Sequence, residues 1–222
     1  MNTIQTPVEL LLASASPRRR QIINLLGLSY TVAVASDGEE EAEARYRGPN
    51  EQLAVWLAKH KAAAALKLPE AAGRLVITAD TTVLLENEIL GKPRDVEQAF
   101  ELLRALRGRW HHVITGVVVC TVREGKTVMQ SASCATPVLM RNYSDREIAE
   151  YVATGDPMDK AGAYGIQNPA FQPTERIDGC YFNVVGLPIC TVIDLLAEFG
   201  VYPSRKHLRA DTDCPWSEKC LI

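Results

Sequence analysis

Asp80 is the first residue whose position suggests chemistry, because it interrupts the strongest β-like run of the chain. The run Leu75–Leu85 is otherwise rich in leucine and β-branched residues. An ionised carboxylate is costly in apolar surroundings unless it is paired, hydrogen-bonded or coordinated to a metal. We therefore expect Asp80 to reach a cleft, and we expect the trio Asp80-Thr81-Thr82 to mark a break between two strands. A carboxylate that only caps a turn is the alternative.

A cationic segment near the N-terminus offers the complementary charge. The segment Arg18–Arg20 follows an apolar run that ends in two hydroxyl residues, Ser14 and Ser16. Ser16 is a good N-cap and Pro17 suits the first helical position, so a helix is expected to begin here. Backbone N–H groups and arginine side chains at such a position favour a phosphate-type anion. A capped surface helix with three solvated arginines is the alternative.

Two lysines elsewhere in the chain could contact the same anion. Lys61 shares the apolar stripe of an amphipathic helix expected over residues 50–68, so its side chain either extends to water or points inward toward an anionic partner. Lys92 lies between Gly91 and Pro93, which suggests a lysine held on a shaped loop. An ordinary turn lysine is the alternative for Lys92.

The unit 159–167 combines Lys160 and Gln167 with glycines and alanines. Small residues allow a ligand or another element to approach the backbone closely. The Gln167 amide is a donor and an acceptor at once, which suits contact with the edge of a base. A surface loop of small residues explains the composition equally well.

An acidic cluster, Asp37-Gly38-Glu39-Glu40-Glu41, follows the strand expected at Tyr30–Val34. A solvated loop is the default interpretation of such a run. Its position at a strand end, where α/β proteins assemble their sites, makes it a candidate for ligand binding.

The elements that must position these residues alternate in type along the chain, which predicts an α/β fold. Apolar periodicity predicts strands at 8–13, 30–34, 75–85, 110–122 and 127–140. It predicts helices at 17–26, 50–68, 95–107 and 145–153, and a last helix whose first turn holds Pro188. The segment Asn183–Pro188 is expected to end a strand before that helix.

Local signals refine three of these elements. Asp95 with Gln98, and Ser144 with Glu147, have the spacing of capping boxes at the start of two helices. The adjacent pair His111-His112 lies at the start of a strand, where neighbouring side chains face opposite ways. We therefore do not expect the two histidines to share a metal.

Composition limits the class of protein. The 222 residues suit one α/β domain over residues 1–202 with a C-terminal tail over 203–222. A hydrophobic fraction of 47% with 23% charged residues is typical of a soluble globular chain. The net charge of -3 argues against binding of long nucleic acid. The sequence contains no stretch of about 18 apolar residues, so we expect no membrane-spanning segment.

The cysteines indicate the compartment. They show neither a CxxC pair nor zinc-ligand spacing, so buried or free thiols in a reducing, cytoplasmic setting are expected. Two of them lie in the polar tail and could oxidise. The six are Cys120, Cys134, Cys180, Cys190, Cys214 and Cys220.

Several separate stretches, in order and spacing, resemble the Maf (septum-formation inhibitor) family. The resemblance covers roughly residues 8–200. The stretches are Ser14-Ala15-Ser16-Pro17-Arg18-Arg19, Thr78-Ala79-Asp80-Thr81, Gly91-Lys92-Pro93-Arg94, His111-His112-Val113-Ile114-Thr115-Gly116-Val117, Asp159-Lys160-Ala161-Gly162-Ala163-Tyr164-Gly165-Ile166-Gln167 and Asn183-Val184-Val185-Gly186-Leu187-Pro188.

The resemblance implies a two-lobed fold with a curved mixed β-sheet flanked by helices and a deep central cleft. It implies hydrolysis of nucleoside triphosphates to the monophosphate and pyrophosphate, a divalent metal cation, Mg or Mn, and a homodimer. The ending Ala163-Tyr164-Gly165-Ile166-Gln167 looks like the branch acting on dTTP and UTP, and the branch preferring 7-methyl-GTP carries different residues there.

The resemblance also implies roles for individual residues. Asp80 would be the general base and, with Glu40 of the acidic cluster, a metal ligand. Ser14 and Ser16 would belong to the substrate-binding turn. Base choice would depend on Arg18, Thr81 and Gln167, and the phosphates would be neutralised by Arg19, Lys61, Lys92 and Lys160.

Cleavage between the α- and β-phosphates needs an aligned water, a base to take its proton, and cations near the leaving pyrophosphate. These residue types fit those needs.

Two departures from the family pattern stand out. A one-residue insertion leaves Glu39 as an alternative to Glu40, and Asn168–Pro173 replaces a glycine-rich continuation.

The leading hypothesis is a pyrimidine-nucleotide pyrophosphatase that removes non-standard or excess triphosphates. The alternatives are a 7-methyl-GTP-type pyrophosphatase and a largely non-catalytic nucleotide-binding regulator of cell division.

Overall fold

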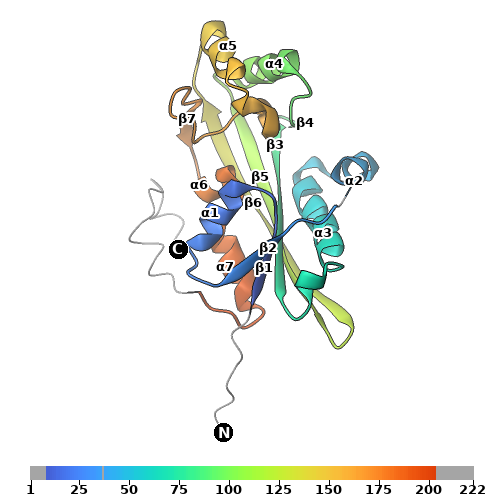
Figure 1. Ribbon diagram of the computed structural model, residues 1–222. Coiled ribbons are helices and arrows are strands. Elements are labelled where there is room, and N and C mark those ends of the chain that lie inside the picture. The colour runs from blue at the N-terminus through green and yellow to red at the C-terminus, as the bar shows by residue number, and fades with distance from the viewer. Residues whose placement is uncertain (1–8, 37, 204–222) are drawn as a thin grey trace.

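The protein is built on one seven-stranded mixed sheet. A computed structural model describes residues 9–36 and 38–203, and excludes the side chains of Glu39 and Glu40. The strand order is β2-β1-β3-β5-β6-β7, with β4 also paired to β3 (Figure 1). The strands are β1 (Leu10–Ala13), β2 (Tyr30–Ala33), β3 (Leu75–Leu85), β4 (Glu88–Leu90), β5 (Trp110–Arg123), β6 (Lys126–Met140) and β7 (Thr174–Ile177).

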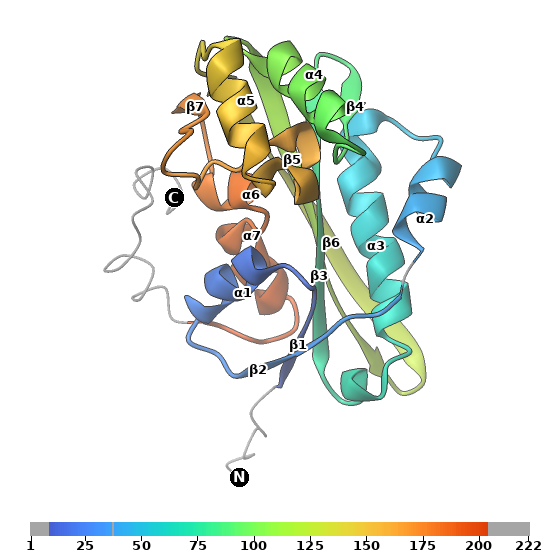
Figure 2. The ribbon, with the colours of Figure 1, turned by 45° about the horizontal axis from the view of Figure 1, so that its top comes forward.

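Helices cover both faces of this sheet, which confirms the predicted α/β class. Figure 2 shows α1, α6 and α7 on one side, α2 and α3 on the other, and α4 and α5 together at one end. The helices are α1 (Pro17–Asn24), α2 (Glu39–Arg45), α3 (Leu53–Ala65), α4 (Val96–Leu106), α5 (Asp145–Ala153), α6 (Tyr181–Val185) and α7 (Ile189–Ala197). Short 3-10 turns η3 (Asp156–Asp159) and η4 (Ala161–Ala163) follow α5.

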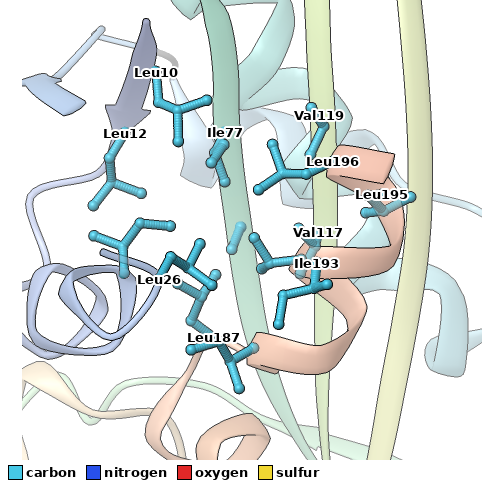
Figure 3. Close-up of a cluster of buried hydrophobic side chains, with 14 of the residues drawn as sticks. Leu10, Leu12, Leu26, Ile77, Val117, Val119, Leu187, Ile193, Leu195 and Leu196 are labelled. Atoms are coloured by element: carbon cyan, nitrogen blue, oxygen red, sulfur yellow. The ribbon is translucent and has the colours of Figure 1, made fainter. Parts of the chain in front are cut away.

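The largest core fills the space between the sheet and α1 and α7. Leu12 of β1, Ile77 of β3 and Val117 of β5 pack there against Leu187 and Ile193 (Figure 3). On the opposite face α3 lies very close to the sheet at Gly116. A Cβ atom at that position would lie 2.5 Å from the carbonyl carbon of Ala54, so only glycine permits this approach.

β3 is flanked on one edge by two different strands that leave part of it uncovered. β1 pairs in parallel with β3 as far as Ile77, and β4 pairs antiparallel with it from Val83. Along the opposite edge β5 pairs with β3 continuously from Val76 to Leu84. Asp80 therefore lies in the segment 78–82 of β3. Among the described strands, only β5 pairs with this segment, so its other edge carries no strand.

The expected break at Asp80-Thr81-Thr82 is wrong, because β3 runs without interruption from Leu75 to Leu85. The ladder to β5 satisfies the backbone throughout, and the carboxylate is accommodated by a side-chain partner instead of by a bend. The predicted hairpin from β5 to β6 and the capping box at Ser144 are both confirmed.

Other expectations need correction. The acidic cluster was expected as a loop, but Glu39 begins α2. Asn183 belongs to α6 instead of ending a strand, and β7 was not predicted. At Asp95 only half of the capping box forms, since the Gln98 side chain accepts from the backbone N–H of Arg94.

The tail predicted over 203–222 lies, beyond Pro203, outside the described residues. Within the described part of the chain, none of the helices has the length and apolar character needed to cross a bilayer.

Candidate active site

A cavity of about 710 Å³ opens beside the uncovered segment of β3. This size is within the range of small-molecule sites, roughly 300–1,000 Å³. Every residue proposed from the sequence as catalytic or substrate-binding lines it. These residues are Ser14, Ser16, Arg18, Arg19, Lys61, Asp80, Thr81, Lys92, Lys160 and Gln167.

Asp80 and Lys61 meet at the floor of the cavity. Of the two orientations considered for Lys61, the structure has the inward one, and its Nζ forms an ion pair with Asp80 Oδ1. Helical side chains lean toward the helix N-terminus, which carries the ammonium group back over the preceding turn of α3. Thr78, two residues before Asp80 on β3, donates its hydroxyl to the Ala58 carbonyl and so ties the same helix to the strand.

Arg19 is held in place by contacts from three parts of the chain. Its Nε donates to the Gly186 carbonyl at 2.8 Å, and one terminal nitrogen donates to Thr81 Oγ1 at 3.1 Å. The other terminal nitrogen lies 3.4 Å from Ser14 Oγ. The planar guanidinium is therefore oriented before any ligand arrives, because each contact fixes a different edge of the group. The N-cap predicted for Ser16 is confirmed by its bond from the Arg19 backbone N–H.

Lys160 and Arg18 lie on the side of the cavity formed by η3. The Lys160 ammonium binds Asp156 Oδ1 at 2.8 Å and Asp159 Oδ1 at 2.7 Å, and Arg18 forms a looser ion pair of 3.6 Å with Asp159. Burial raises the pKa of the Asp156 carboxyl, but hydrogen bonds from Lys160 and Tyr151 outweigh it, and the net pKa is lowered. Both carboxylates thus orient cations that face the cavity.

The lining of the cavity also includes buried aliphatic and aromatic residues. Tyr164 lines it and makes a 2.6 Å hydrogen bond with His111 Nε2. Burial lowers the pKa of His111 to about 4, so the ring is neutral at physiological pH. His112 is exposed, as expected for adjacent residues of a strand. Gln167 is also exposed and lies at the rim, where a base edge could reach its amide.

A second cavity, of about 570 Å³, shares Asp80, Thr81 and Lys92 with the first and is also lined by Glu41 and Glu43. Thr82 lines it too, and its buried hydroxyl oxygen has no hydrogen-bond partner among the described residues.

The acidic residue proposed as a second metal ligand, Glu40, and its alternative, Glu39, have side chains outside the described part of the structure. Among the described residues no group of three or more His, Cys, Asp or Glu side chains could hold a metal by itself.

Sequence reasoning missed the residues that support the site from behind. Asn183 is fully buried, donates to Val113 O and Thr136 Oγ1, and accepts from the Thr115 backbone N–H. The Thr115 hydroxyl in turn contacts Thr81 Oγ1 at 2.9 Å. Asp80 was identified because it is a polar residue inside an apolar run. Asn183 lies between Phe182 and Val184, so the same signal could have identified Asn183. The partner Asp156 precedes Lys160 by four residues, a spacing that was also readable.

Comparison with known proteins supports the resemblance stated above. The family model described as Maf-like protein matches residues 9–199. A dTTP/UTP pyrophosphatase of Pelotomaculum thermopropionicum is 45% identical over 192 residues, covering 86% of this chain and 97% of that protein. One from Dictyoglomus turgidum is 42% identical over 194 residues, with 86% and 96% covered.

A third relative, a dTTP/UTP pyrophosphatase of Dehalococcoides mccartyi, is 40% identical over 219 residues, which covers 96% of this chain and 92% of that protein. Since the family model spans nearly all of the described residues and these relatives align over most of their own length, the chain belongs to the Maf family.

Proposed function

We propose that this protein is a nucleoside triphosphate pyrophosphatase that hydrolyses dTTP and UTP, and modified pyrimidine nucleotides, to the monophosphate and pyrophosphate. The observation that carries the proposal is the presence of the Asp80 carboxylate and several cationic side chains in one cavity. The printed names of the relatives supply the substrate class.

In this mechanism Asp80 takes a proton from the water that attacks the α-phosphorus. The bond from that phosphorus to the bridging oxygen breaks, and pyrophosphate leaves with the electron pair. Lys61 favours the ionised carboxylate that can act as a base, because an adjacent cation stabilises the charged form. A positioned base of this kind contributes about 10²- to 10⁴-fold to the rate.

The cations stabilise the charge that develops on the leaving group. Arg19 suits this task best, because its three hydrogen bonds hold it in position before the substrate binds. Lys92 and Lys160 add positive charge, and Lys160 must exchange part of its contact with Asp156 and Asp159 for a phosphate.

The remaining residues of the cavity bind the nucleoside end. We assign base choice to Arg18, Thr81 and Gln167. The turn that holds Ser14 and Ser16 lies beside the phosphates, where its hydroxyl and N–H groups can donate hydrogen bonds.

A divalent cation, Mg or Mn, fits the acidic part of the site. Mg²⁺ is commonly held by one or two carboxylates together with substrate phosphates, so a cluster of three protein ligands is not required. Asp80 and Glu40 would hold it, and Thr82, whose buried hydroxyl has no hydrogen-bond partner among the described residues, lines the second cavity together with Asp80. The cation would supply charge neutralisation for the triphosphate.

We further propose a cytoplasmic location, which suits the thiols that the described cysteines carry. A homodimer stays a prediction, and sedimentation or light scattering of the purified protein measures it directly.

A panel of nucleotides tests the function. Purified protein is assayed with dTTP, UTP, 7-methyl-GTP, dATP and dGTP in Mg²⁺ or Mn²⁺, and both pyrophosphate and monophosphate are quantified. We expect release from dTTP and UTP at the highest kcat/KM, and none after chelation of the metal. Faster turnover of 7-methyl-GTP would reassign the substrate, and nucleotide binding without pyrophosphate release would favour a regulator.

The base is tested by Asp80→Asn, which should lower kcat by about 10²- to 10⁴-fold while circular dichroism stays unchanged. Asp95→Asn is the matched control, because asparagine serves equally well as an N-cap and Asp95 lies at the start of α4. Equal activity of the two variants would contradict the assignment of Asp80.

A further inference from the structure

Two cysteines from distant parts of the chain lie in contact behind the active site. Cys134 is on β6 and Cys180 is the N-cap residue of α6, and a side-chain hydrogen bond joins the two thiols. Cys134 stands opposite Thr115 in the ladder to β5, so both side chains lie on the sheet face that α6 covers. Both cysteines are partly exposed, so a small solute can reach them.

The pair has the reactivity that thiol oxidation needs. The hydrogen bond from Cys180 lowers the pKa of the Cys134 thiol, an effect that outweighs burial, and Thr136 lowers it further. The thiolate is the form that attacks an oxidant. Cys120 provides the contrast within the same sheet, because burial raises the pKa of its thiol to about 12.

Hydrogen bonds connect Cys180 to residues that line the cavity. Its sulfur accepts the backbone N–H of Asn183 at 3.4 Å, and the Asn183 carbonyl accepts the Thr115 hydroxyl at 3.0 Å. That hydroxyl contacts Thr81, the neighbour of Asp80. A change at Cys180 is therefore transmitted through side chains that are already in hydrogen-bonding contact.

The other end of the same short helix holds the arginine of the site. Gly186 follows α6 and accepts the Arg19 guanidinium on its carbonyl. α6 therefore has the thiol pair at its first turn and the contact to Arg19 at its last.

We propose that Cys134 and Cys180 are a redox site, where oxidation by a peroxide forms an intrachain disulfide that slows catalysis in the neighbouring cleft. The effect on catalysis rests on the proposed function, whereas the disulfide itself does not. Disulfides in reducing compartments are usually transient and sense oxidants.

The chemistry proceeds in two steps. The Cys134 thiolate attacks one peroxide oxygen, the O–O bond breaks, and water leaves with one added proton, giving a sulfenic acid. The Cys180 thiol then attacks that sulfur, the S–O bond breaks, the S–S bond forms, and a second water leaves. The two thiols together lose two electrons and two protons, and the peroxide is reduced to water. A dithiol reductant reverses the bond by exchange.

Disulfide formation must move the start of α6. Bonded sulfur atoms are about 2.05 Å apart, which is closer than any hydrogen-bonding contact between thiols, so Cys180 shifts toward β6. Its bond from the Asn183 N–H is strained, and Arg19 moves with the helix. Misplacement of a positioning group by roughly 1 Å can cost about 10²-fold in rate, so we expect kcat for dTTP to fall at least about tenfold.

The test uses the full chain and reads the bond independently of activity. Reduced protein is treated with hydrogen peroxide, remaining thiols are alkylated, and peptides are identified by mass spectrometry. We expect a cross-linked pair of peptides, one containing Cys134 and the other Cys180, whose mass is two hydrogens less than the sum of the two reduced peptides. Cys120 should be recovered in its alkylated form, which shows that its thiol was not oxidised. Dithiothreitol should remove the cross-link and restore kcat. Peptide mapping distinguishes this bond from oxidation of Cys214 and Cys220.

Three variants sharpen the result. Cys134→Ser should neither form the cross-link nor lose activity in peroxide, and Cys180→Ser should behave likewise because serine also caps a helix. Cys190→Ser is the matched control, since it removes another partly exposed thiol and should leave both the cross-link and the inhibition intact.

Absence of the cross-link in the wild-type protein, or over-oxidation of Cys134 with Cys180 still reduced, would overturn the proposal. A cross-link with unchanged kcat would overturn its effect on catalysis. If the reduced protein released no pyrophosphate from any nucleotide, the proposed function would fail while the cross-link measurement would still decide the redox site.

Discussion

The ammonium group of Lys61 lies 2.5 Å from a carboxylate oxygen of Asp80, and both side chains are largely buried, at 16% and 7% exposure. Each residue explains the presence of the other. The lysine can lie on the apolar face of α3, and the aspartate can lie within an apolar strand, because their charges are paired. Breaking such a pair by removing one partner costs more than replacing both, since the remaining charge stays buried.

Lys61→Met is therefore expected to lower the free energy of unfolding by about 3 kcal/mol. The double variant Lys61→Met/Asp80→Asn should be more stable than Lys61→Met alone, because the buried carboxylate that has lost its lysine is replaced by a neutral amide. Urea unfolding of the wild type, both single variants and the double variant measures the coupling. Lys59→Met is the control, since Lys59 is exposed on the same helix and should change stability by less than about 0.5 kcal/mol. Strictly additive effects would contradict the pairing.

Arg19→Lys should reduce kcat/KM for dTTP by about tenfold or more with little loss of stability. Lysine keeps the charge but has no planar fork, so it cannot contact the Gly186 carbonyl, Ser14 and Thr81 together. Steady-state kinetics measures the change. Arg20→Lys is the comparison, because Arg20 is the next residue of α1, is exposed and does not line the cavity. Similar losses in both variants would mean that only the total charge of α1 matters.

Acid should weaken the fold through His111. Burial lowers its folded-state pKa to about 4 from an ordinary value of 6.5, so between these values the unfolded chain binds a proton that the folded chain does not. The contribution is fully present above pH 6.5 and is lost as the pH falls toward 4, to a total of about 3 kcal/mol.

Unfolding free energies measured across this pH window test the effect. His111→Gln should flatten the pH dependence, and His112→Gln should keep it, because His112 is exposed on the same strand. The same slope in His111→Gln as in the wild type would show that other groups cause it.

Gly116→Ala should impair both stability and activity. The added methyl group collides with the backbone of α3 at Ala54 and Val55, so the helix must move away from the sheet. Gly116 stands opposite Asp80 in the ladder, and the displaced helix is the one that carries Lys61. Thermal unfolding and kcat are the measurements. An alanine variant with wild-type values of both would show that the helix does not rest on this position.

The sequence predicted the strands and helices that have strong periodicity, because their patterns depend on which face is buried. The long hairpin of β5 and β6 and the helices α4 and α5 follow this rule. β3 was misjudged at Asp80 because a sequence pattern does not reveal a partner that arrives from another element. β7 and α6 are short, with four and five residues, and their form depends on tertiary contacts such as those of Asn183.

The sequence was enough to predict which residues form the candidate site, but it did not predict all the contacts that hold them in place. Charged residues in apolar or glycine-rich settings identified Asp80, Lys61 and Lys160. The Gly186 carbonyl that binds Arg19 is a backbone atom from a distant part of the chain, and such an atom carries no distinct signal in one sequence.

The uncovered edge of β3 has a consequence for how a nucleotide enters and leaves. Between Ile77 and Val83 no described strand pairs with β3 on that side, so a nucleotide can approach Asp80 there without displacing any of the described strands. Asp80 meanwhile stays fixed by the unbroken ladder to β5. Substrate exchange can thus proceed past a stationary carboxylate, with the sheet itself left intact.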